Sequence, residues 1–372
     1  MRKILIFLPS LDGGGAERVF VELANTFSSS GVSVDLALAR ATGPYLSELA
    51  PSVRVVDFSC PGVLRSLPQL ARHLRTERPE AMLSALEHAN VVSVLARRIA
   101  RRQTRCVIST RSVLSMLKHE VGVLNAWRVT QASRLAYPFA DAVIANSAGV
   151  AADVACFMRI PRERIHVIHN PLSIESIDRL SREPPEGAGI DAAAAPLILS
   201  VGRLSGLKDF PTLLRAFALA RRTHACRLAI LGEGPERRRL ESLASRLGIG
   251  SGLLLPGFVA NPFAWMRSAA LFVSSSISEG CPNALMQALA CGTRVVSTDC
   301  IGGSREVLDN GKWGELVPVG DAVAMARAIT AALDATDQVD VRRRAADFSL
   351  EKTARRYLEV LLPADFSSEA SP

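Results

Sequence analysis

The residues best suited to chemistry begin with two cations in the second half of the chain. Arg203 and Lys208 follow a predicted strand, Leu197–Val201, at its carboxyl end, with Gly202 in between. Two cations on the same side of a strand end can clamp a diphosphate, because guanidinium and ammonium groups both bind phosphate oxygens. Exposed salt bridges would explain the same two residues, so the pair alone leaves both interpretations open.

A denser pattern lies in residues 274–293, which read SSSISEGCPNALMQALACGT. This segment joins a predicted strand to a predicted helix, and a proline near a helix start presets the backbone for it. The first amides of a helix have no partner inside it and carry the positive end of the helix dipole, which suits a phosphate. A glutamate before the helix can accept hydrogen bonds from sugar hydroxyls. The residues expected to meet a ligand here are Glu279, Gly280, Cys281, Pro282, Asn283, Ala284, Leu285 and Gln287.

Three glycines, Gly13, Gly14 and Gly15, stand between the first predicted strand and the first predicted helix. Glycine lets backbone amides approach an anion with no side chain in between. The spacing is not that of a dinucleotide-binding loop, because Arg18 stands where the third glycine of that loop would be. The motif fits either an anion-binding turn or a plain glycine turn.

The elements that would position these residues alternate along the chain. Short apolar segments rich in β-branched residues alternate with longer amphipathic ones, which predicts parallel sheets with right-handed crossovers. In the first half, strands are predicted at 3–8, 32–37, 53–58, 106–109 and 142–145, and a helix at 16–29. In the second half, strands are predicted at 197–201, 227–231, 252–255, 271–274 and 294–298, and helices at 210–220 and 236–247.

The alternation stops at residues 181–196, a segment rich in proline, glycine and alanine, and then restarts. The chain is therefore predicted to be an α/β protein with two Rossmann-like, doubly wound domains. We place the first domain at residues 1–172 and the second at residues 173–348. Ligand should bind in a cleft between the carboxyl ends of the strands.

Taken in order, the motifs resemble those of family 4 (group 1) glycosyltransferases. They are Gly-Gly-Gly-Ala-Glu-Arg at 13–18, Gly-Arg at 202–203 with Lys-Asp at 208–209, Gly-Glu-Gly-Pro at 232–235, Glu-Gly-Cys-Pro-Asn at 279–283 and Gly-Gly-Ser-Arg-Glu at 302–306. The resemblance implies the GT-B fold, with two facing domains, and metal-independent, retaining transfer of a sugar from a nucleotide diphosphate. It also implies that the amphipathic segment 349–362 forms a helix that packs back on the first domain.

The resemblance gives roles to the residues that match. It implies that Arg203 and Lys208 bind the diphosphate and stabilise the leaving group, helped by amides near Gly13 and Gly14 and at 283–285. Glu279 matches the first glutamate of the family's E-x7-E motif, which holds the transferred sugar near the anomeric carbon. The residues expected around the nucleoside base are Gly232, Glu233, Phe258 and Val259.

One position departs from the family's pattern. The second glutamate of E-x7-E, which binds the ribose hydroxyls, is Gln287 here. Glutamine still accepts a hydrogen bond but lacks the charge, a difference of about 1 kcal/mol or somewhat more. Weaker or altered ribose binding is expected. A non-catalytic protein that binds a nucleotide sugar is the alternative that this position makes conceivable.

In the family, a histidine or similar residue lies over the transferred sugar, after a strand that corresponds to residues 107–110. Arg111 follows that strand here. It is expected to position the β-phosphate, to position the acceptor, or merely to pair with a carboxylate. His88 and His119 are the other candidates on the acceptor side, although a lone histidine is more often an ordinary surface or core residue.

The mechanism expected from these residues needs no metal and no cofactor, since the nucleotide sugar is itself the substrate. The sequence has no Asp-x-Asp metal motif, and helix dipoles with Arg203 and Lys208 can neutralise charge on the departing diphosphate. No side chain is an obvious nucleophile. Transfer on one face of the sugar, in which the leaving phosphate deprotonates the acceptor hydroxyl, therefore agrees with the retaining mechanism that the resemblance implies. An epimerase or an inverting transferase is the alternative among enzymes. The missing third glycine disfavours a dinucleotide oxidoreductase.

Composition and charge set the remaining expectations. The chain has 372 residues, of which 48% are hydrophobic and 22% are charged, a globular composition with room for two domains. It lacks 18 consecutive apolar residues, its first apolar segment is short for a signal peptide, and its seven cysteines show no CxxC spacing. We therefore expect a cytoplasmic protein with reduced thiols.

The net charge of +8 lies wholly in the first half, where residues 1–172 hold 21 Lys and Arg against 13 Asp and Glu. A solvated surface would explain this excess, and so would attraction to anionic lipid headgroups or an anionic acceptor. Nucleic acid is disfavoured because no recognition motif accompanies the basic residues. We expect a UDP-linked hexose as donor and a glycan or lipid-linked acceptor of bacterial polysaccharide or lipopolysaccharide synthesis, at the inner face of the membrane.

Overall fold

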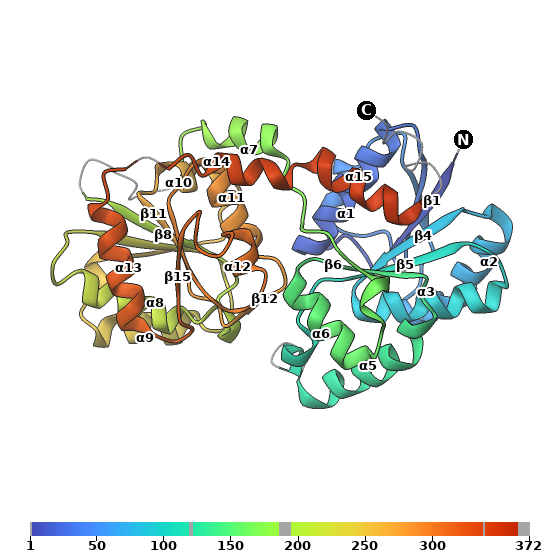
Figure 1. The fold of residues 1–372 in the computed structure, drawn as a ribbon, viewed down its shortest axis with the longest axis horizontal. Coiled ribbons are helices and arrows are strands. Elements are labelled where there is room, and N and C mark those ends of the chain that lie inside the picture. The colour runs from blue at the N-terminus through green and yellow to red at the C-terminus, as the bar shows by residue number, and fades with distance from the viewer. Residues whose placement is uncertain (1, 119–121, 186–194, 338, 364–372) are drawn as a thin grey trace. The chain divides into compact units, whose positions relative to one another are not determined.

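The computed structural model describes residues 2–118, 122–185, 195–337 and 339–363 (Figure 1). Contacts divide the chain into two compact units, one formed by residues 1–171 with 350–372 and the other by residues 172–349. Each unit is built on a parallel sheet with helices on both faces, as the alternating pattern predicts.

In the described residues, the sheet of the first unit has the strand order β3-β2-β1-β4-β5-β6-β7. All of its strand pairs are parallel, and most of its strands are buried on both faces. The strands are β1 (Lys3–Leu8), β2 (Ser33–Leu38), β3 (Arg54–Asp57), β4 (Ala81–Ala85), β5 (Arg105–Thr110), β6 (Ala142–Ala145) and β7 (Ile165–Val167). The helices are α1 (Gly15–Ser29), α2 (Leu67–Glu77), α3 (Glu87–Ala100), α5 (Val123–Ala136), α6 (Ala148–Met158) and α15 (Leu350–Leu361).

The last helix, α15, belongs to the first unit although the second unit precedes it in sequence. It lies beside α1 (Figure 1), and the rings of Phe20 and Tyr357 meet edge to face at 6.4 Å. Tyr357 is fully buried and Leu361 nearly so, in one core with strands β1 and β2. The apolar face of α15 therefore completes the core on this side of the first sheet.

The sheet of the second unit has the order β10-β9-β8-β11-β13-β15 within the described residues. Its strands are β8 (Leu197–Val201), β9 (Arg227–Leu231), β10 (Leu253–Gly257), β11 (Leu271–Ser274), β13 (Val295–Thr298) and β15 (Glu315–Val317). Two short strands, β12 (Ser278–Glu279) and β14 (Ile301–Gly302), pair separately. The helices are α7 (Ile174–Ser181), α8 (Phe210–Ala220), α9 (Arg237–Arg246), α10 (Pro262–Ser268), α11 (Asn283–Cys291), α12 (Ser304–Val307), α13 (Ala322–Asp334) and α14 (Arg342–Ala345).

Every predicted strand agrees with the structure within two residues, but β4, β7, β15 and the two short strands β12 and β14 are not in that prediction. Strand β4 reads AMLSA and contains no β-branched residue. It lies between β1 and β5 and is buried throughout. Burial between neighbours on both sides, and not local preference, makes this segment a strand. Strands β7 and β15 have three residues each, too few to give a period.

Both sheets have a point where the strand order reverses, and these points mark where ligands bind in such folds. In the second unit the reversal lies between β8 and β11, and in the first unit between β1 and β4. The segments that leave the carboxyl ends of β8 and β11 are 202–208 and 275–279. These are the two segments of the second unit that carry the predicted cations and glutamate.

Candidate active site

A small pocket opens at the reversal point of the second sheet, with a volume of about 20 Å³. It brings together Lys208, Glu279 and the start of α11, which are far apart in sequence. Five of the predicted site residues line it, namely Lys208, Glu279, Pro282, Ala284 and Leu285. The strand order therefore gathers the predicted phosphate-binding and sugar-binding groups at one place.

Lys208 and Glu279 are in direct contact in this pocket. The ammonium Nζ of Lys208 donates a hydrogen bond to Oε1 of Glu279, and the pair is an ion pair. The hydroxyl of Ser276 donates to the same oxygen at 2.6 Å. Both side chains are mostly buried, with 26% of the lysine and 14% of the glutamate exposed, so water screens their attraction only partly.

The backbone around this pair is held by bonds between the two strand-end segments. The hydroxyl of Ser275 donates to the carbonyl of Lys208 at 2.7 Å, and the amide of Ile277 donates to the carbonyl of Leu207 at 2.8 Å. Glu279 pairs with Gly302 across β12 and β14. At Gly302 φ is +123°, and a Cβ there would lie 1.5 Å from the carbonyl oxygen of Glu279. Only glycine allows this approach.

Helix α11 starts beside the pair, with Pro282 as its N-cap. The first intrahelical bond runs from the amide of Met286 to the carbonyl of Pro282. The amides of Ala284 and Leu285 make no hydrogen bond to the described residues. Two donors at the positive end of a helix thus border the pocket, which is an arrangement that attracts an anion.

Arg203 lies on the loop after β8 with its side chain exposed. Among the described residues it has neither a hydrogen-bond acceptor nor an ion-pair partner. The adjacent Gly202 lies against Lys208, because a Cβ at this glycine would stand 3.1 Å from Cε of the lysine. Glycine therefore lets the lysine stem run close over the loop, while the arginine remains available to a ligand.

The loops after β9 and β10 are tied to the loop after β8. The amide of Gly232 donates to the carbonyl of Gly257 at 2.8 Å, and that of Leu204 donates to Glu233 at 2.9 Å. At Gly232 φ is +137°, and a Cβ there would overlap the carbonyl of Gly202. The carboxylate of Glu233 accepts from Arg237 at 2.9 Å.

Two apolar side chains follow Gly257, and Gln287 lies in the second turn of α11. Phe258 is 82% exposed and Val259 is partly exposed, so both are accessible on the surface of the second unit. The side chain of Gln287 is partly exposed and makes no hydrogen bond with the described residues. Their predicted roles around the base and the ribose stay predictions.

In the first unit, the glycine turn before α1 is occupied by a side chain of its own helix. The amides of Gly13 and Gly14 both donate to Oε2 of Glu17, each at 2.8 Å. Gly15 is the first residue of α1. The turn therefore binds an oxyanion of the chain itself, the carboxylate of Glu17. A phosphate would have to displace Glu17 to use these two amides.

The candidates on the acceptor side follow the carboxyl ends of neighbouring strands. Arg111 comes directly after β5, is 9% exposed, and donates from Nη2 to Oδ1 of Asn170 at 2.6 Å. No carboxylate of the described residues lies within ion-pairing distance of it, and its three predicted roles stay predictions. His88 follows β4 and is exposed, although the surrounding protein lowers its pKa by desolvation. His119 lies outside the described residues.

Comparison with protein families agrees with the motifs. Residues 13–176 match the family model described as Glycosyltransferase Family 4, and residues 195–335 match the model described as Glycosyl transferases group 1. Together the two matches span most of both units. The chain is a family 4 glycosyltransferase.

Two relatives that match most of this chain are themselves named as glycosyltransferases. An N-acetylgalactosamine-N,N'-diacetylbacillosaminyl-diphospho-undecaprenol 4-alpha-N-acetylgalactosaminyltransferase of Campylobacter jejuni is 29% identical over 97% of this chain and 100% of its own length. The lipopolysaccharide core biosynthesis glycosyltransferase LpsE of Rhizobium meliloti is 28% identical over 85% of this chain and 84% of its own. The structure of HepE from Anabaena in complex with UDP superposes with a TM-score of 0.78, at 22% identity, over 97% of this chain and 99% of its own. The fold is therefore GT-B.

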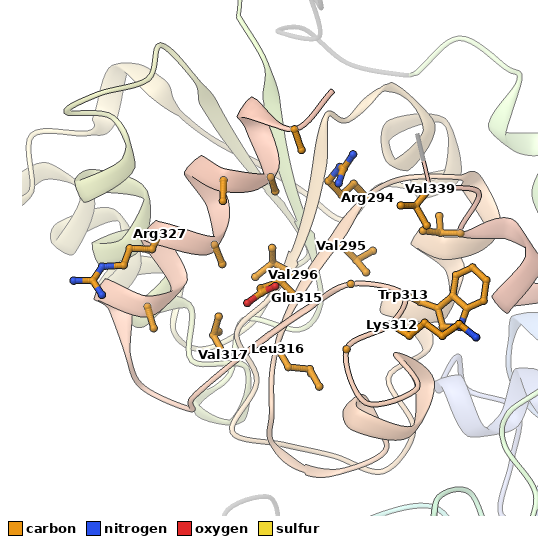
Figure 2. A pocket seen from close by; sticks show the side chains of 18 of the residues that line it. Arg294, Val295, Val296, Lys312, Trp313, Glu315, Leu316, Val317, Arg327 and Val339 are labelled. Atoms are coloured by element: carbon orange, nitrogen blue, oxygen red, sulfur yellow. The ribbon is translucent and has the colours of Figure 1, made fainter. Parts of the chain in front are cut away.

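A second, larger pocket of the glycosyltransferase, about 660 Å³, lies along the edge strand β15 and helix α13 (Figure 2). Valine and alanine side chains form most of its lining. Figure 2 shows Arg327 at one end and Lys312 with Trp313 at the other, so the cations do not converge. No predicted site residue lines it, and β15 is two strands away from the reversal point. We therefore place the chemistry at the smaller pocket.

Three further features of the described part of the chain bear on the predictions. No group of three or more His, Cys, Asp or Glu residues is arranged there to hold a metal ion. None of its helices combines the length and the apolar character needed to cross a membrane. None of the seven cysteines, all of which lie in this part of the chain, forms a disulfide, and Cys156 alone among them is exposed. Buried Cys281 donates to the sulfur of Met286 at 3.3 Å, so this predicted donor-binding residue contributes packing.

Sequence reasoning missed the residues that hold the site in place. Ser275 and Ser276 fix Lys208 and Glu279, and both belong to a run of three serines at the end of β11. Gly302 was part of a recognised motif but had no assigned role. The signal available in the sequence was a polar run directly after an apolar strand, since such residues lie at the edge where ligands bind. In the sequence, Glu17 is distinguished only as a residue that can cap the first helix, so its occupation of the glycine turn was not predicted.

Proposed function

We propose that this glycosyltransferase moves a hexose-type sugar from a UDP-linked donor to a glycan or lipid-linked acceptor, with retention at the anomeric carbon and without a metal ion. The observation that carries the proposal is the meeting of Lys208, Glu279 and the start of α11 at one pocket. Cations and helix amides suit a diphosphate, and a carboxylate suits sugar hydroxyls.

Charge neutralisation supports a mechanism without metal. Negative charge develops on the diphosphate as the glycosidic bond breaks, and fixed donors at that position stabilise it. Lys208 and the amides of Ala284 and Leu285 border the pocket, and Arg203 on the adjacent loop has no competing partner in the described chain. The departing phosphate oxygen then takes the proton of the acceptor hydroxyl on the same face of the sugar.

The names of the relatives support the substrate class. One of them acts on a diphospho-undecaprenol-linked sugar and another belongs to lipopolysaccharide core biosynthesis. The HepE structure contains UDP. We extend these features to this chain as a proposal, and assign it to bacterial cell-surface polysaccharide or lipopolysaccharide synthesis in the cytoplasm, at the inner face of the membrane.

A surface of the first unit suits contact with an anionic membrane. Helix α5 presents Leu124, Trp127 and Leu135 outward, exposed by 60%, 60% and 76%, while its small residues face the protein. The neighbouring Arg98 lies over the ring of Phe139 at 4.0 Å, next to the exposed Arg101 and Arg102. Exposed apolar and basic side chains together fit the headgroup region of an anionic bilayer. Replacing Leu124, Trp127 and Leu135 with serine should release the protein from phosphatidylglycerol vesicles in a flotation assay.

The donor proposal is tested by thermal shift with UDP, GDP, ADP and CDP, followed by assay of the matching nucleotide sugars. We expect UDP to raise the melting temperature of the wild type, and Arg203→Gln to abolish most of that rise. Arg239→Gln is the matched control, because Arg239 pairs with Glu236 on the exposed face of α9. Absence of protection by every nucleotide would reject the proposal.

The finer parts of the mechanism have separate tests. Product stereochemistry read by NMR should show a retained anomeric configuration, and an inverted product would exclude same-face transfer. Activity should survive treatment with EDTA. The second candidate, a non-catalytic binding protein, rests on Gln287, and it predicts nucleotide protection without release of UDP from the donor.

A further inference from the structure

Arg111 is the one arginine in the described part of the chain that is buried, and its charge has no counterion there. Its exposed fraction is 9%, and no Asp or Glu carboxylate of the described residues lies within ion-pairing distance. Its contacts are Oδ1 of Asn170 at 2.6 Å and the ring face of Phe20 at 5.4 Å. A buried cation that lacks a paired anion is costly, and such a group persists where binding uses it.

Half of the unsatisfied buried polar atoms of the described residues belong to Arg111, to the two residues before it, or to Asn146, which is bonded to it. Nη1 of Arg111 has no hydrogen-bond partner, and neither do Ser109 Oγ, Thr110 Oγ1 and Asn146 Oδ1. These are four of the eight buried side-chain atoms without a partner in the described chain. They come from the end of β5 and from the residue after β6, and Asn146 donates to the carbonyl of Arg111 at 3.1 Å. Buried polar atoms are normally satisfied, so this concentration is typical of a binding site.

We infer that Arg111, with Asn146 and Asn170 beside it, is a binding site for a phosphate group. Asn170 and Phe20 fix two sides of the guanidinium and leave Nη1 to donate to an oxyanion. Oδ1 of Asn146 accepts from a hydroxyl next to that oxyanion, which is the combination that a sugar phosphate offers. Nη1 has no contact with solvent here, so the group enters through a local opening of the side chains around it.

The phosphate belongs to the acceptor, and this assignment rests on the proposed function. The donor's diphosphate has Lys208, Arg203 and the α11 amides in the second unit, whereas Arg111 is in the first unit. An acceptor that carries its sugar on a phosphate or diphosphate would place a second anion on the enzyme. The diphosphate of the donor is the other source of a phosphate group, and the experiment distinguishes the donor's phosphate from the acceptor's.

The test is isothermal titration calorimetry on the full chain with two probes, UDP and inorganic pyrophosphate. Wild type saturated with UDP should bind one further equivalent of pyrophosphate. Arg111→Gln should weaken this second event by about tenfold or more, because a charged hydrogen bond is lost, and leave UDP binding unchanged. Arg221→Gln is the matched control, because Arg221 also lies over an aromatic ring and belongs to no proposed site, and it should bind both probes as wild type does.

Asn170→Asp is a second variant, chosen so that loss of binding can be distinguished from unfolding. It places a carboxylate next to Arg111, so it should neutralise the cation, preserve or raise the melting temperature and still remove pyrophosphate binding. A purely structural role would give the same stability without that loss. The inference is overturned if UDP-saturated wild type takes no pyrophosphate or if Arg111→Gln binds it normally. Loss of UDP binding in Arg111→Gln would reassign the phosphate to the donor and reject the acceptor assignment. Failure of wild type to bind UDP would instead count against the proposed function.

Discussion

The ammonium of Lys208 donates to the carboxylate of Glu279, although 71 residues separate the two in sequence. The same oxygen accepts from Ser276, so both donors are engaged by Glu279. A diphosphate that attracts the lysine must draw it from the glutamate. The carboxylate oxygen that is released can then accept from a sugar hydroxyl. Binding of the donor's diphosphate by Lys208 and binding of its sugar by Glu279 are therefore expected to be coupled.

The first prediction concerns the coupling of Lys208 and Glu279. Lys208→Met should lower kcat by about 10²–10³, the loss typical of removing one donor that stabilises transition-state charge. Glu279→Gln should lower transfer as well, and the double variant should lose less than the two single losses multiplied. Steady-state kinetics in a double-mutant cycle measures this coupling. Strictly multiplicative losses would show that the contact has no part in catalysis.

The second prediction concerns Gln287. Gln287→Glu restores a carboxylate at the position that the family resemblance assigns to the ribose hydroxyls. It should tighten UDP binding by about 1 kcal/mol, or roughly fivefold in Kd, because a charged acceptor binds a hydroxyl more strongly than an amide does. Calorimetry with UDP and with inorganic pyrophosphate separates the causes, since pyrophosphate has no ribose. An equal gain for both ligands would contradict a role at the ribose.

The third prediction concerns Gly302, which supports the backbone of Glu279. Gly302→Ala should destabilise the protein by about 1–3 kcal/mol, the usual cost of a side chain in a strained backbone region, and should displace the glutamate. Thermal melting and transfer activity should both fall. Gly250→Ala is the control, because no atom lies within 4 Å of a Cβ there. If Gly302→Ala melts and turns over like the control, the two short strands do not position Glu279.

The fourth prediction concerns the stability of the first unit at low pH. Asp35 is 1% exposed and is bonded to Arg54 at 2.8 Å, with Lys3 and His73 each at 3.1 Å. Burial alone would raise the pKa of this carboxyl, but hydrogen bonds from His73, Arg54 and Lys3 outweigh burial and hold the pKa well below its ordinary value. The folded state therefore favours the ionised form of Asp35.

The sign of the effect follows from this depressed pKa. The stabilisation is complete above the unfolded-state pKa, about 3.9, and is lost as the pH falls below it. Asp35→Asn should cost about 3 kcal/mol at neutral pH, as expected when one partner of a buried ion pair is removed. Urea titrations at pH 7 and pH 3 should show that the gap in unfolding free energy between wild type and variant narrows at the lower pH. A gap that is constant with pH would assign the loss to packing.

Local sequence was enough to find the two sheet strands that lead into the site. The segments Leu197–Val201 and Leu271–Ser274 were predicted with the bounds that the structure has, because β-branched and apolar residues end there at glycine or serine. Helix α8, Phe210–Ala220, was also predicted with its observed bounds. Strand β4 was not found, since its residues have no local preference and only its neighbours in the sheet bury it.

The sequence alone determined which residues carry charge and which segments follow strand ends, because residue type and hydrophobic period are local properties. Tertiary structure decided which of them meet. Strands β8 and β11 are neighbours in the sheet, and this brings Lys208 to Glu279. The order of the strands cannot be derived from the spacing of residues in the sequence. Tertiary structure likewise left Arg111 buried, with no counterion among the described residues. Hydrogen bonding and burial depend on neighbours that are distant in sequence, and so only the folded chain defines them.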